Sequence, residues 1–388
     1  MAIPVSYNLR NCLQRPVSTL TTAVAVGLTV LIFVGALALA SGFQAALTAT
    51  GSDNNIMILR KGADSEVSSA LTRDTVNIIR AHDAVAQNAE GRPLASPEVV
   101  VMVVKDRLGQ TGSSNVLVRG IDPEALALRD NVKIVNGRMF SPGADEVIVG
   151  KLVADRFVGF NIGDTVRFGQ QTVTVAGHFE AGGSSFESEV WGDNAVLMPA
   201  FRGEVFQTMT FRMKDPSRFE EVKKEMEADP RLQVDVKRES EFYAAQSELL
   251  ANLLRFLGVF ITIVMGVGAV FGAMNTMYAM VGTRLREIAT MLVLGFRPIV
   301  VMLSFMIEAV LISLFGGVLG CLAALPINGI VTSTTNFASF SEVAFAFKVT
   351  PQSLFYGMIV AGLLGLAGGF FPALRAARQP LVEGLRGG

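Results

Sequence analysis

"FLGVFITIVMGVGAVFGAMNTMYAMVGT", residues 256–283, contains no charged side chain and lies between Arg255 and Arg284. A helix needs about 20 mostly apolar residues to cross the ~30 Å hydrocarbon layer, so this stretch is long enough to span a membrane. The chain has 388 residues, of which 51% are hydrophobic and 17% charged, with a mean hydropathy of +0.45. Because this is too apolar for an ordinary soluble protein and too charged for a fully embedded one, the apolar residues must be concentrated in segments.

Three further stretches are apolar and long enough to span a bilayer: Thr22–Ala40, Pro298 to about residue 330, and Val349–Leu374. We therefore predict four transmembrane helices rather than core helices of a soluble protein. The first stretch could instead be a cleaved signal peptide, since Arg10 and Arg15 precede it. Its apolar region exceeds the roughly 7–15 residues of a signal, which favours an uncleaved anchor.

Basic residues flank the predicted spans on one side of the membrane: Arg10, Arg15, Arg284, Arg286, Arg297, Arg375, Arg378 and Arg386. Only Glu287 and Glu383 oppose them there. Short basic flanks stay in the cytoplasm, so both termini are predicted to be cytoplasmic. Residues 42–246, and a short loop near residues 332–348, are then placed outside.

The predicted outer region is acidic and lacks cysteine. Residues 42–254 contain 23 Lys and Arg against 30 Asp and Glu, a net charge of −7. Membrane orientation explains this asymmetry, so no nucleic-acid partner is expected. The two cysteines, Cys12 and Cys321, lie outside the region, which must fold without disulfides.

Two β-α-β patterns frame the outer region, and the segments that form them are Asn55–Lys61, Ser65–His82, Glu98–Lys105, Phe206–Lys214, Pro216–Asp229 and Leu232–Lys237. They bracket a β-rich insertion at about residues 106–205, with a hairpin around Gly169 and Gln170. Asp122 and Pro123 are expected to begin a short helix.

The predicted fold is an α-helical membrane protein with four transmembrane helices and a mixed α+β extracytoplasmic domain. Its expected parts are residues 1–50, residues 51–240, and residues 241–388. Next to the membrane, Ser41–Ala49 and Glu239–Phe256 read as helical continuations of spans one and two. Such stiff extensions could transmit movement or could simply anchor the domain, and the sequence leaves both open.

Residues for catalysis are scarce. His82 and His178 are the only histidines and have no Cys or His at ligand spacing, so no metal site is expected. The Gly-Lys pair at residues 150–151 is not a phosphate loop, because Asp145 and Leu152 stand where Gly and Ser or Thr are needed. We expect no catalytic residue and no cofactor bound by this chain.

"FEAGGSSFESEVW", residues 179–191, combines two glycines, three serines, three acids and the only tryptophan. It is either a contact surface for cargo or a partner, or a solvated loop that ends in a packed aromatic residue. The second interpretation is favoured.

Small residues recur four apart within the predicted spans, at Gly268, Gly272, Gly316, Gly320, Ala361, Gly365 and Gly369. Such faces permit close helix contact within a chain or between two copies. Glu308 is an ionisable residue about ten positions into the third span. It is either a functional polar site inside the membrane or a side chain that reaches toward the inner surface.

Residues 283–297, between spans two and three, are predicted to form a short amphipathic helix. The residues that share its apolar face are Leu285, Ile288, Ala289, Leu292 and Phe296, and Gly295 offers a stop. From this pattern alone, the helix could equally anchor the turn at the membrane surface or bind a partner.

The segment Asn275–Leu311, "NTMYAMVGTRLREIATMLVLGFRPIVVMLSFMIEAVL", resembles the signature segment of FtsX-type permeases of ABC transporters. Phe371–Arg386 resembles the end of that family and Arg10–Leu28 its beginning, while Asn136–Phe157 is similar to the MacB-type periplasmic core. The resemblance touches all four spans and the outer domain.

The resemblance implies that residues 283–297 form a coupling helix that binds an ABC ATPase, with contacts from Arg284, Arg286, Glu287, Ile288, Leu292 and Gly295. It also implies a homodimer and Porter-like halves with a Sabre-like insertion. The sequence departs from MacB itself in lacking its fused ATPase domain, so a separate subunit is expected to use ATP and Mg²⁺.

These expectations combine into a permease subunit of a type VII, mechanotransmission-type ABC transporter in the bacterial inner membrane, in contact with membrane lipids. It would export or extract a substrate, with a periplasmic adaptor as a further candidate partner. The alternative is an FtsX-like signalling scaffold that activates an extracytoplasmic enzyme without transport.

Overall fold

The computed structural model describes residues 16–109, 111–201 and 203–379. The chain forms two compact units. A helical unit comprises Met1–Ser41, Asn252–Ile330 and Phe347–Gly388, and an α/β unit comprises Gly42–Ala251 and Val331–Ala346. Several residues used for the orientation prediction lie outside the described residues, namely Arg10, Arg15, Glu383 and Arg386, as does Cys12.

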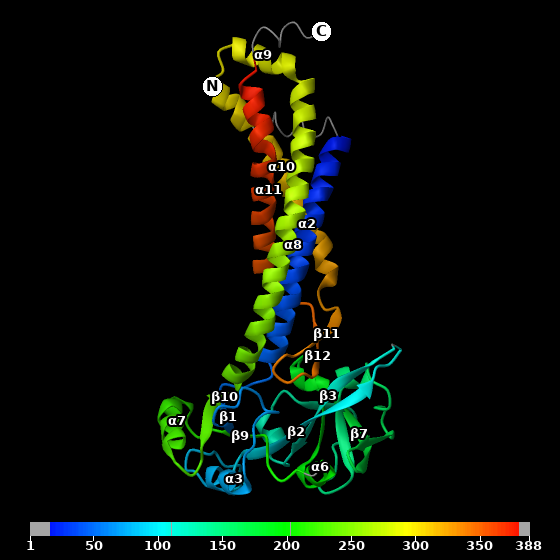
Figure 1. The fold of residues 1–388 in the computed structure, drawn as a ribbon, viewed down its shortest axis with the longest axis vertical. Helices are drawn as coiled ribbons and strands as arrows, with labels where there is room; N and C mark the ends of the chain where they lie inside the picture. Colours follow the sequence, from blue (N-terminus) through cyan, green and yellow to red (C-terminus); the bar gives the residue numbers. More distant parts are fainter. Residues whose placement is uncertain (1–15, 110, 202, 380–388) are drawn as a thin grey trace. The chain divides into compact units, whose positions relative to one another are not determined.

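Four long helices confirm the predicted spans: α2 (Pro16–Thr48), α8 (Glu239–Thr283), α10 (Pro298–Ala324, extended by η3, Leu325–Ile327) and α11 (Pro351–Ala377) (Figure 1). Each is long and apolar enough to cross a membrane. Helices α2 and α8 continue without a break beyond their apolar centres, as the sequence predicted. The side chain of Thr350 caps α11 and Pro351 occupies its first turn, which fixes where this helix begins.

Small residues bring the helices of the helical unit into close contact. A Cβ atom on Gly316 of α10 would lie 2.4 Å from the carbonyl oxygen of Ala23 in α2. One on Gly369 of α11 would lie 2.5 Å from Ala309 Cβ in α10. Only glycine therefore permits these helix crossings.

Not all predicted small-residue faces pack within the chain. Gly320 approaches Gly27 of α2, and Gly365 approaches Ser313 of α10. By contrast, among the described residues none lies within 4 Å of a Cβ placed on Gly268 or Gly272 of α8. That face of α8 is open in the single chain.

One ten-stranded sheet organises the α/β unit, in the order β10-β1-β9-β2-β3-β8-β5-β7-β4, with β6 paired to β7. The strands are β1 (Asn55–Arg60), β2 (Ala95–Asp106), β3 (Ser113–Ile121), β4 (Lys133–Gly137), β5 (Glu146–Gly150), β6 (Thr165–Phe168), β7 (Gln171–Glu180), β8 (Glu189–Asp193), β9 (Thr208–Arg212) and β10 (Val234–Arg238). The predicted hairpin is β6–β7, and Gly169 supplies its positive φ of +56°.

Short helices complete the α/β unit: α3 (Arg73–Arg80), α4 (Ala125–Leu128), α5 (Lys151–Ala154), η1 (Ser185–Ser188), α6 (Asn194–Ala200), η2 (Pro216–Arg218) and α7 (Phe219–Ala228). The prediction of a helix at residues 65–82 was wrong about where the helix begins. The side chain of Thr72 accepts a hydrogen bond from the backbone of Thr75 and so caps a helix that begins only at Arg73.

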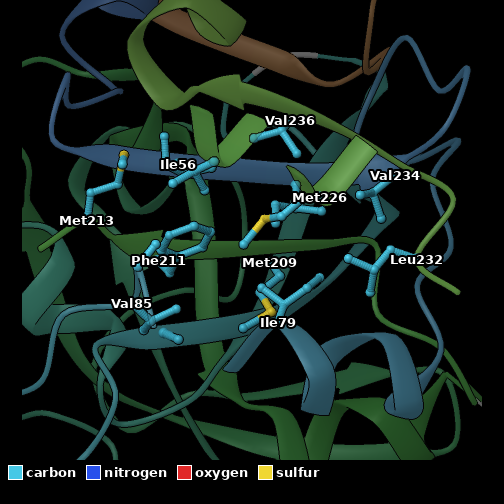
Figure 2. Close-up of a cluster of buried hydrophobic side chains, with 14 of the residues drawn as sticks. Ile56, Ile79, Val85, Met209, Phe211, Met213, Met226, Leu232, Val234 and Val236 are labelled. Atoms are coloured by element: carbon cyan, nitrogen blue, oxygen red, sulfur yellow. The ribbon is translucent and has the colours of Figure 1, made fainter. Parts of the chain in front are cut away.

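Two hydrophobic cores occupy the α/β unit. The first lies between α3, α7 and strands β1, β9 and β10, where Ile79, Phe211 and Met226 are buried together (Figure 2). The second lies in the insertion, around Phe160, Phe168 and Val190. The β-rich insertion therefore has a core of its own, as the short strands of its sequence predicted.

The segment between α10 and α11 folds as a hairpin, β11 (Val331–Thr335) and β12 (Glu342–Ala346), and belongs to the α/β unit. The sequence predicted only a short loop here. Glu342 is bound by Arg107 and Arg156 of the insertion at 2.5 and 2.7 Å, which attaches the hairpin to that part of the unit.

Candidate functional site

Helix α9 (Leu285–Val293) is the predicted amphipathic helix between spans two and three. It ends in a turn in which Gly295 has φ +90°. The Gly295 N–H donates to Leu292 O and the Phe296 N–H to Met291 O, both at 3.1 Å. This is the Schellman pattern that glycine favours, and it places Phe296 beyond the helix rather than on it.

The inner face of α9 is packed into the helical unit. Ile288 and Ala289 are 0% and 2% exposed. Ile288 joins a hydrophobic cluster with Met280 of α8, Phe305 of α10 and Ala376 of α11. A displacement of α9 must therefore displace the ends of three spans or open this cluster.

Arg284, at the N-cap of α9, is held by two carboxylates. Its Nη1 donates to Glu308 Oε2 and its Nε to Glu287 Oε2, both at 3.0 Å. The guanidinium also lies over the Phe305 ring, 5.2 Å from the centroid. Glu308 is 2% exposed, so it pairs inside the protein rather than reaching toward the surface. Because a buried ion pair loses about 3–5 kcal/mol when one partner is removed, this contact fixes α9 to α10.

The six residues predicted to contact an ATPase fall into two groups. Arg286, Glu287 and Gly295 are exposed, whereas Arg284 and Ile288 are buried within the chain, and Leu292 is partly buried. The exposed three can reach a partner directly. Arg284 and Ile288 instead hold α9 in place.

Sequence reasoning missed two exposed apolar residues at the C-terminal end of α9. Val293 and Leu294 are 60% and 68% exposed, and with Arg286 and Thr290 they form an outward stripe. The signal was present in the sequence, because residues 286, 290, 293 and 294 follow helical spacing on the face opposite Ile288. We call these four residues the α9 stripe.

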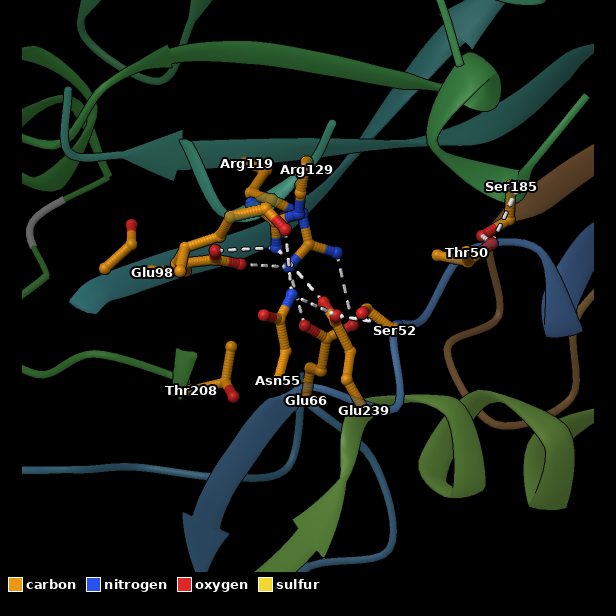
Figure 3. A network of polar contacts seen from close by, with 12 residues as sticks. Thr50, Ser52, Asn55, Glu66, Glu98, Arg119, Arg129, Ser185, Thr208 and Glu239 are labelled. Carbon is orange, nitrogen blue, oxygen red and sulfur yellow. Dashed lines mark hydrogen bonds and ion pairs between the residues drawn. The ribbon is translucent and has the colours of Figure 1, made fainter. Parts of the chain in front are cut away.

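A second polar cluster lies inside the α/β unit (Figure 3). Arg119 of β3 is fully buried, and it binds Glu66, Glu98 and Glu189 at 2.6–2.7 Å. Burial raises the pKa of the Glu189 carboxyl, against the opposing effect of Arg119. The Arg119 network thus joins a loop of the β-α-β part to strands β2, β3 and β8.

The Arg119 network extends to the first residue of α8. Arg129, at the end of α4, lies 2.7 Å from Glu98 and 3.8 Å from Glu239, and its guanidinium lies 4.6 Å from the Phe186 ring centroid. Glu239 also accepts hydrogen bonds from Ser52 N and Asn55 Nδ2. The sequence did contain a signal for this buried network, because Glu98 and Arg119 are charged residues within otherwise apolar strands.

A helical unit with four helices long and apolar enough to span a membrane, joined to a mixed α/β unit, defines a multi-pass membrane protein. Residues 19–229 match the MacB-like periplasmic core domain, and residues 259–381 match the FtsX-like permease C-terminal region. The chain therefore belongs to the family with a MacB-like periplasmic core domain and is an FtsX/MacB-type ABC transporter permease.

Relatives include two proteins named macrolide export ATP-binding/permease protein MacB. That of Bordetella avium is 37% identical over 136 residues, covering 35% of this chain and 19% of the relative. One from Aeromonas hydrophila is 25% identical over 336 residues, covering 80% of this chain and 49% of the relative. The chain spans half or less of the length of these relatives.

Two solved structures match about half of the chain. The periplasmic region of MacB from Actinobacillus actinomycetemcomitans matches with a TM-score of 0.37 and 11% identity, covering 50% of this chain and 93% of that one. The extracellular domain of the noncanonic ABC-type transporter YknZ from Gram-positive bacteria matches with a TM-score of 0.36 and 16% identity, covering 47% and 100%.

Proposed function

We propose that this chain is the permease subunit of a mechanotransmission-type ABC transporter and that a separate ATPase subunit binds it through α9. The observation that carries the proposal is the division of α9 into two faces. Ile288 and Ala289 are packed among the spans, whereas the α9 stripe is exposed. A partner that binds one arrangement of α9 more tightly than another would shift the whole helical unit toward it.

In this proposal the partner binds and hydrolyses ATP with Mg²⁺, and this chain supplies no catalytic residue. The protein lies in the bacterial inner membrane with both termini in the cytoplasm. It acts as a homodimer, for which the open Gly268 and Gly272 face of α8 is available. Cargo is exported or extracted on the periplasmic side, where an adaptor protein is a further proposed partner.

The test replaces the two exposed charges of α9, in the double variant Arg286→Ala/Glu287→Ala. The tagged chain is purified from its native membrane together with its ATPase, and both are reconstituted in nanodiscs. We expect at least tenfold weaker association of the ATPase, because the variant loses two exposed contact residues. The permease should stay folded with a slightly lower thermal midpoint, because Arg284 loses the carboxylate of Glu287 but keeps that of Glu308.

A matched control is Arg218→Ala/Glu221→Ala, which removes another exposed pair, 3.0 Å apart, in the α/β unit. It should bind the ATPase as the unaltered chain does. Normal ATPase binding by the α9 variant would reject the proposed docking, and recovery of no ATPase with the unaltered chain would reject the proposed function.

A further inference from the structure

The segment Ser184–Trp191, formed by η1 and the start of β8, is buried along its whole length. Its sequence favoured a solvated loop, and this was wrong, since only Gly182 and Gly183 just before it are exposed. Phe186 and Trp191 are both 0% exposed, and their rings meet edge to face with centroids 5.1 Å apart. The segment's polar residues Ser185, Ser188 and Glu189 make contacts with other segments rather than with water.

The end of α2 makes the first of these contacts. Thr50, two residues past the helix, places its Oγ1 2.8 Å from Ser185 Oγ. The same oxygen accepts a hydrogen bond from Ser185 N at 2.9 Å. All of these atoms are buried, so the bonds are not exchanged for water, and the end of α2 is fixed to η1.

The beginning of α8 makes the second contact. Phe186 meets Tyr243 edge to face, with the ring centroids 5.9 Å apart. Glu189 receives two hydrogen bonds from Arg119, at 2.7 and 2.8 Å, and so enters the network that ends at Glu239. The first two turns of α8 are thus connected to this segment by a ring contact and by charges.

The hairpin between α10 and α11 makes the third contact. Ser188 Oγ accepts a hydrogen bond from Ala344 N of β12 at 2.9 Å, in a buried position. Residue Ala344 stands two positions from Glu342, which Arg107 and Arg156 hold. The hairpin is therefore attached both to η1 and to the two arginines of the insertion.

The segment is in turn built into the insertion. Strand β8 pairs with β3 and with β5. A Cβ atom on Gly150, at the end of β5, would lie 2.2 Å from the Glu187 carbonyl oxygen, so the two backbones are in direct contact. Close-packed contacts of this kind move together or break; they do not stretch.

We infer that Ser184–Trp191 is a relay segment, the point at which movement of the membrane helices enters the β-rich insertion. It contacts each of the three stretches that lead along the chain into a spanning helix, namely the end of α2, the start of α8 and the β11–β12 hairpin. Ser185, Phe186 and Ser188 act as positioning residues. This inference rests on the proposed function, since it requires an input at α9.

The test follows input and output separately by hydrogen exchange and mass spectrometry on the full complex in nanodiscs, with the ATPase, with and without ATP and vanadate. Peptides covering residues 285–293 report the input, and peptides covering residues 146–180 report the output. In the unaltered protein we expect nucleotide-dependent exchange in both. The relay variant Thr50→Val/Phe186→Leu/Ser188→Ala should keep the response at α9 and reduce that of the insertion at least fivefold.

Two serines of the same unit that are exposed provide the control, Ser141→Ala/Ser217→Ala, which should leave both responses unchanged. If the relay variant shows faster hydrogen exchange than the unaltered protein before nucleotide is added, the milder variant Thr50→Val/Ser188→Ala replaces it. This variant should lose at least half of the nucleotide-dependent change in exchange at residues 146–180. A full response of the insertion in either folded variant overturns the relay. No response at α9 in the unaltered complex overturns the proposed function itself.

Discussion

At the scale of single residues, the pair formed by Arg284 and Glu308 decides how α9 is held. Neither residue is exposed by more than 9%, and the distance between the charged groups is 3.0 Å. A lone charge in such surroundings is costly, whereas a paired one is tolerated. The effects of substitutions at Arg284 and Glu308 on stability should therefore be coupled rather than additive.

We predict that Glu308→Gln lowers the stability of the helical unit by about 3 kcal/mol, because Arg284 then keeps a buried charge after losing that carboxylate. The double variant Arg284→Met/Glu308→Gln should recover at least half of this loss. Thermal unfolding in detergent measures both. As a control, Arg297→Met changes an exposed arginine near the same helix and should have little effect. Additive losses in the double variant would contradict the coupling.

A second residue-scale prediction concerns Glu342, whose side chain is 3% exposed. Burial raises its pKa, but hydrogen bonds from Ser333, Ser114, Arg156 and Arg107 outweigh burial and hold the pKa below the ordinary 4.5. A carboxyl with a lowered folded-state pKa stabilises the fold above its unfolded pKa, and this contribution disappears as pH falls through the folded value.

Glu342→Gln should therefore destabilise the α/β unit at pH 7, and the difference from the unaltered chain should close as pH falls below 4.5. The fluorescence of Trp191, the single tryptophan, reports unfolding of this unit. A difference that stays constant from neutral to acidic pH would show that the carboxylate charge has no part in holding the hairpin.

At the scale of elements, α9 carries both a buried face and an exposed face, and we propose the exposed face for docking. The apolar face was readable from the spacing of Ile288, Ala289 and Leu292, and the structure packs it among the spans. Val293 and Leu294 differ from these residues, because among the described residues none covers more than part of their side chains. Apolar side chains left in water next to exposed charges are typical of an interface.

Replacing Val293 and Leu294 by serine should weaken ATPase binding by roughly thirtyfold, because two apolar contacts of about 1 kcal/mol each are lost. The thermal midpoint of the free permease should stay the same or rise. Val158→Ser/Ile162→Ser removes two comparably exposed apolar residues, 52% and 46%, from the insertion and serves as the control. Equal binding by both variants would exclude the α9 stripe as the docking surface.

At the scale of the whole molecule, the glycines of the spans form two groups, those that contact another helix of the same chain and those that do not. Gly316 and Gly369 serve contacts within the chain, and among the described residues none lies close enough to explain Gly268 and Gly272. In a membrane, small residues on an open helix face permit a second helix to approach. The structure thus distinguishes glycines that pack helices within the subunit from glycines that could contact a second subunit.

We expect Gly272→Leu to leave the subunit folded and to shift the mass in detergent, measured by light scattering, from dimer toward monomer. Gly316→Leu should instead lower the thermal midpoint, because its side chain would overlap the Ala23 carbonyl, and overpacking costs about 1–3 kcal/mol. A Gly272→Leu protein that remains fully dimeric would remove this face of α8 from the proposed homodimer.

The sequence by itself determined the four spans, the amphipathic α9, the β-α-β halves and the β-rich insertion, because uncharged runs and residue periodicity are local properties. Only the tertiary structure decided that Glu308 pairs with Arg284, that Arg284 and Ile288 face inward, and that residues 184–191 are buried. A polar, glycine-containing stretch reads as solvated until its partners are known. Those partners, Thr50, Tyr243 and Ala344, lie far away along the chain, and only folding brings them together.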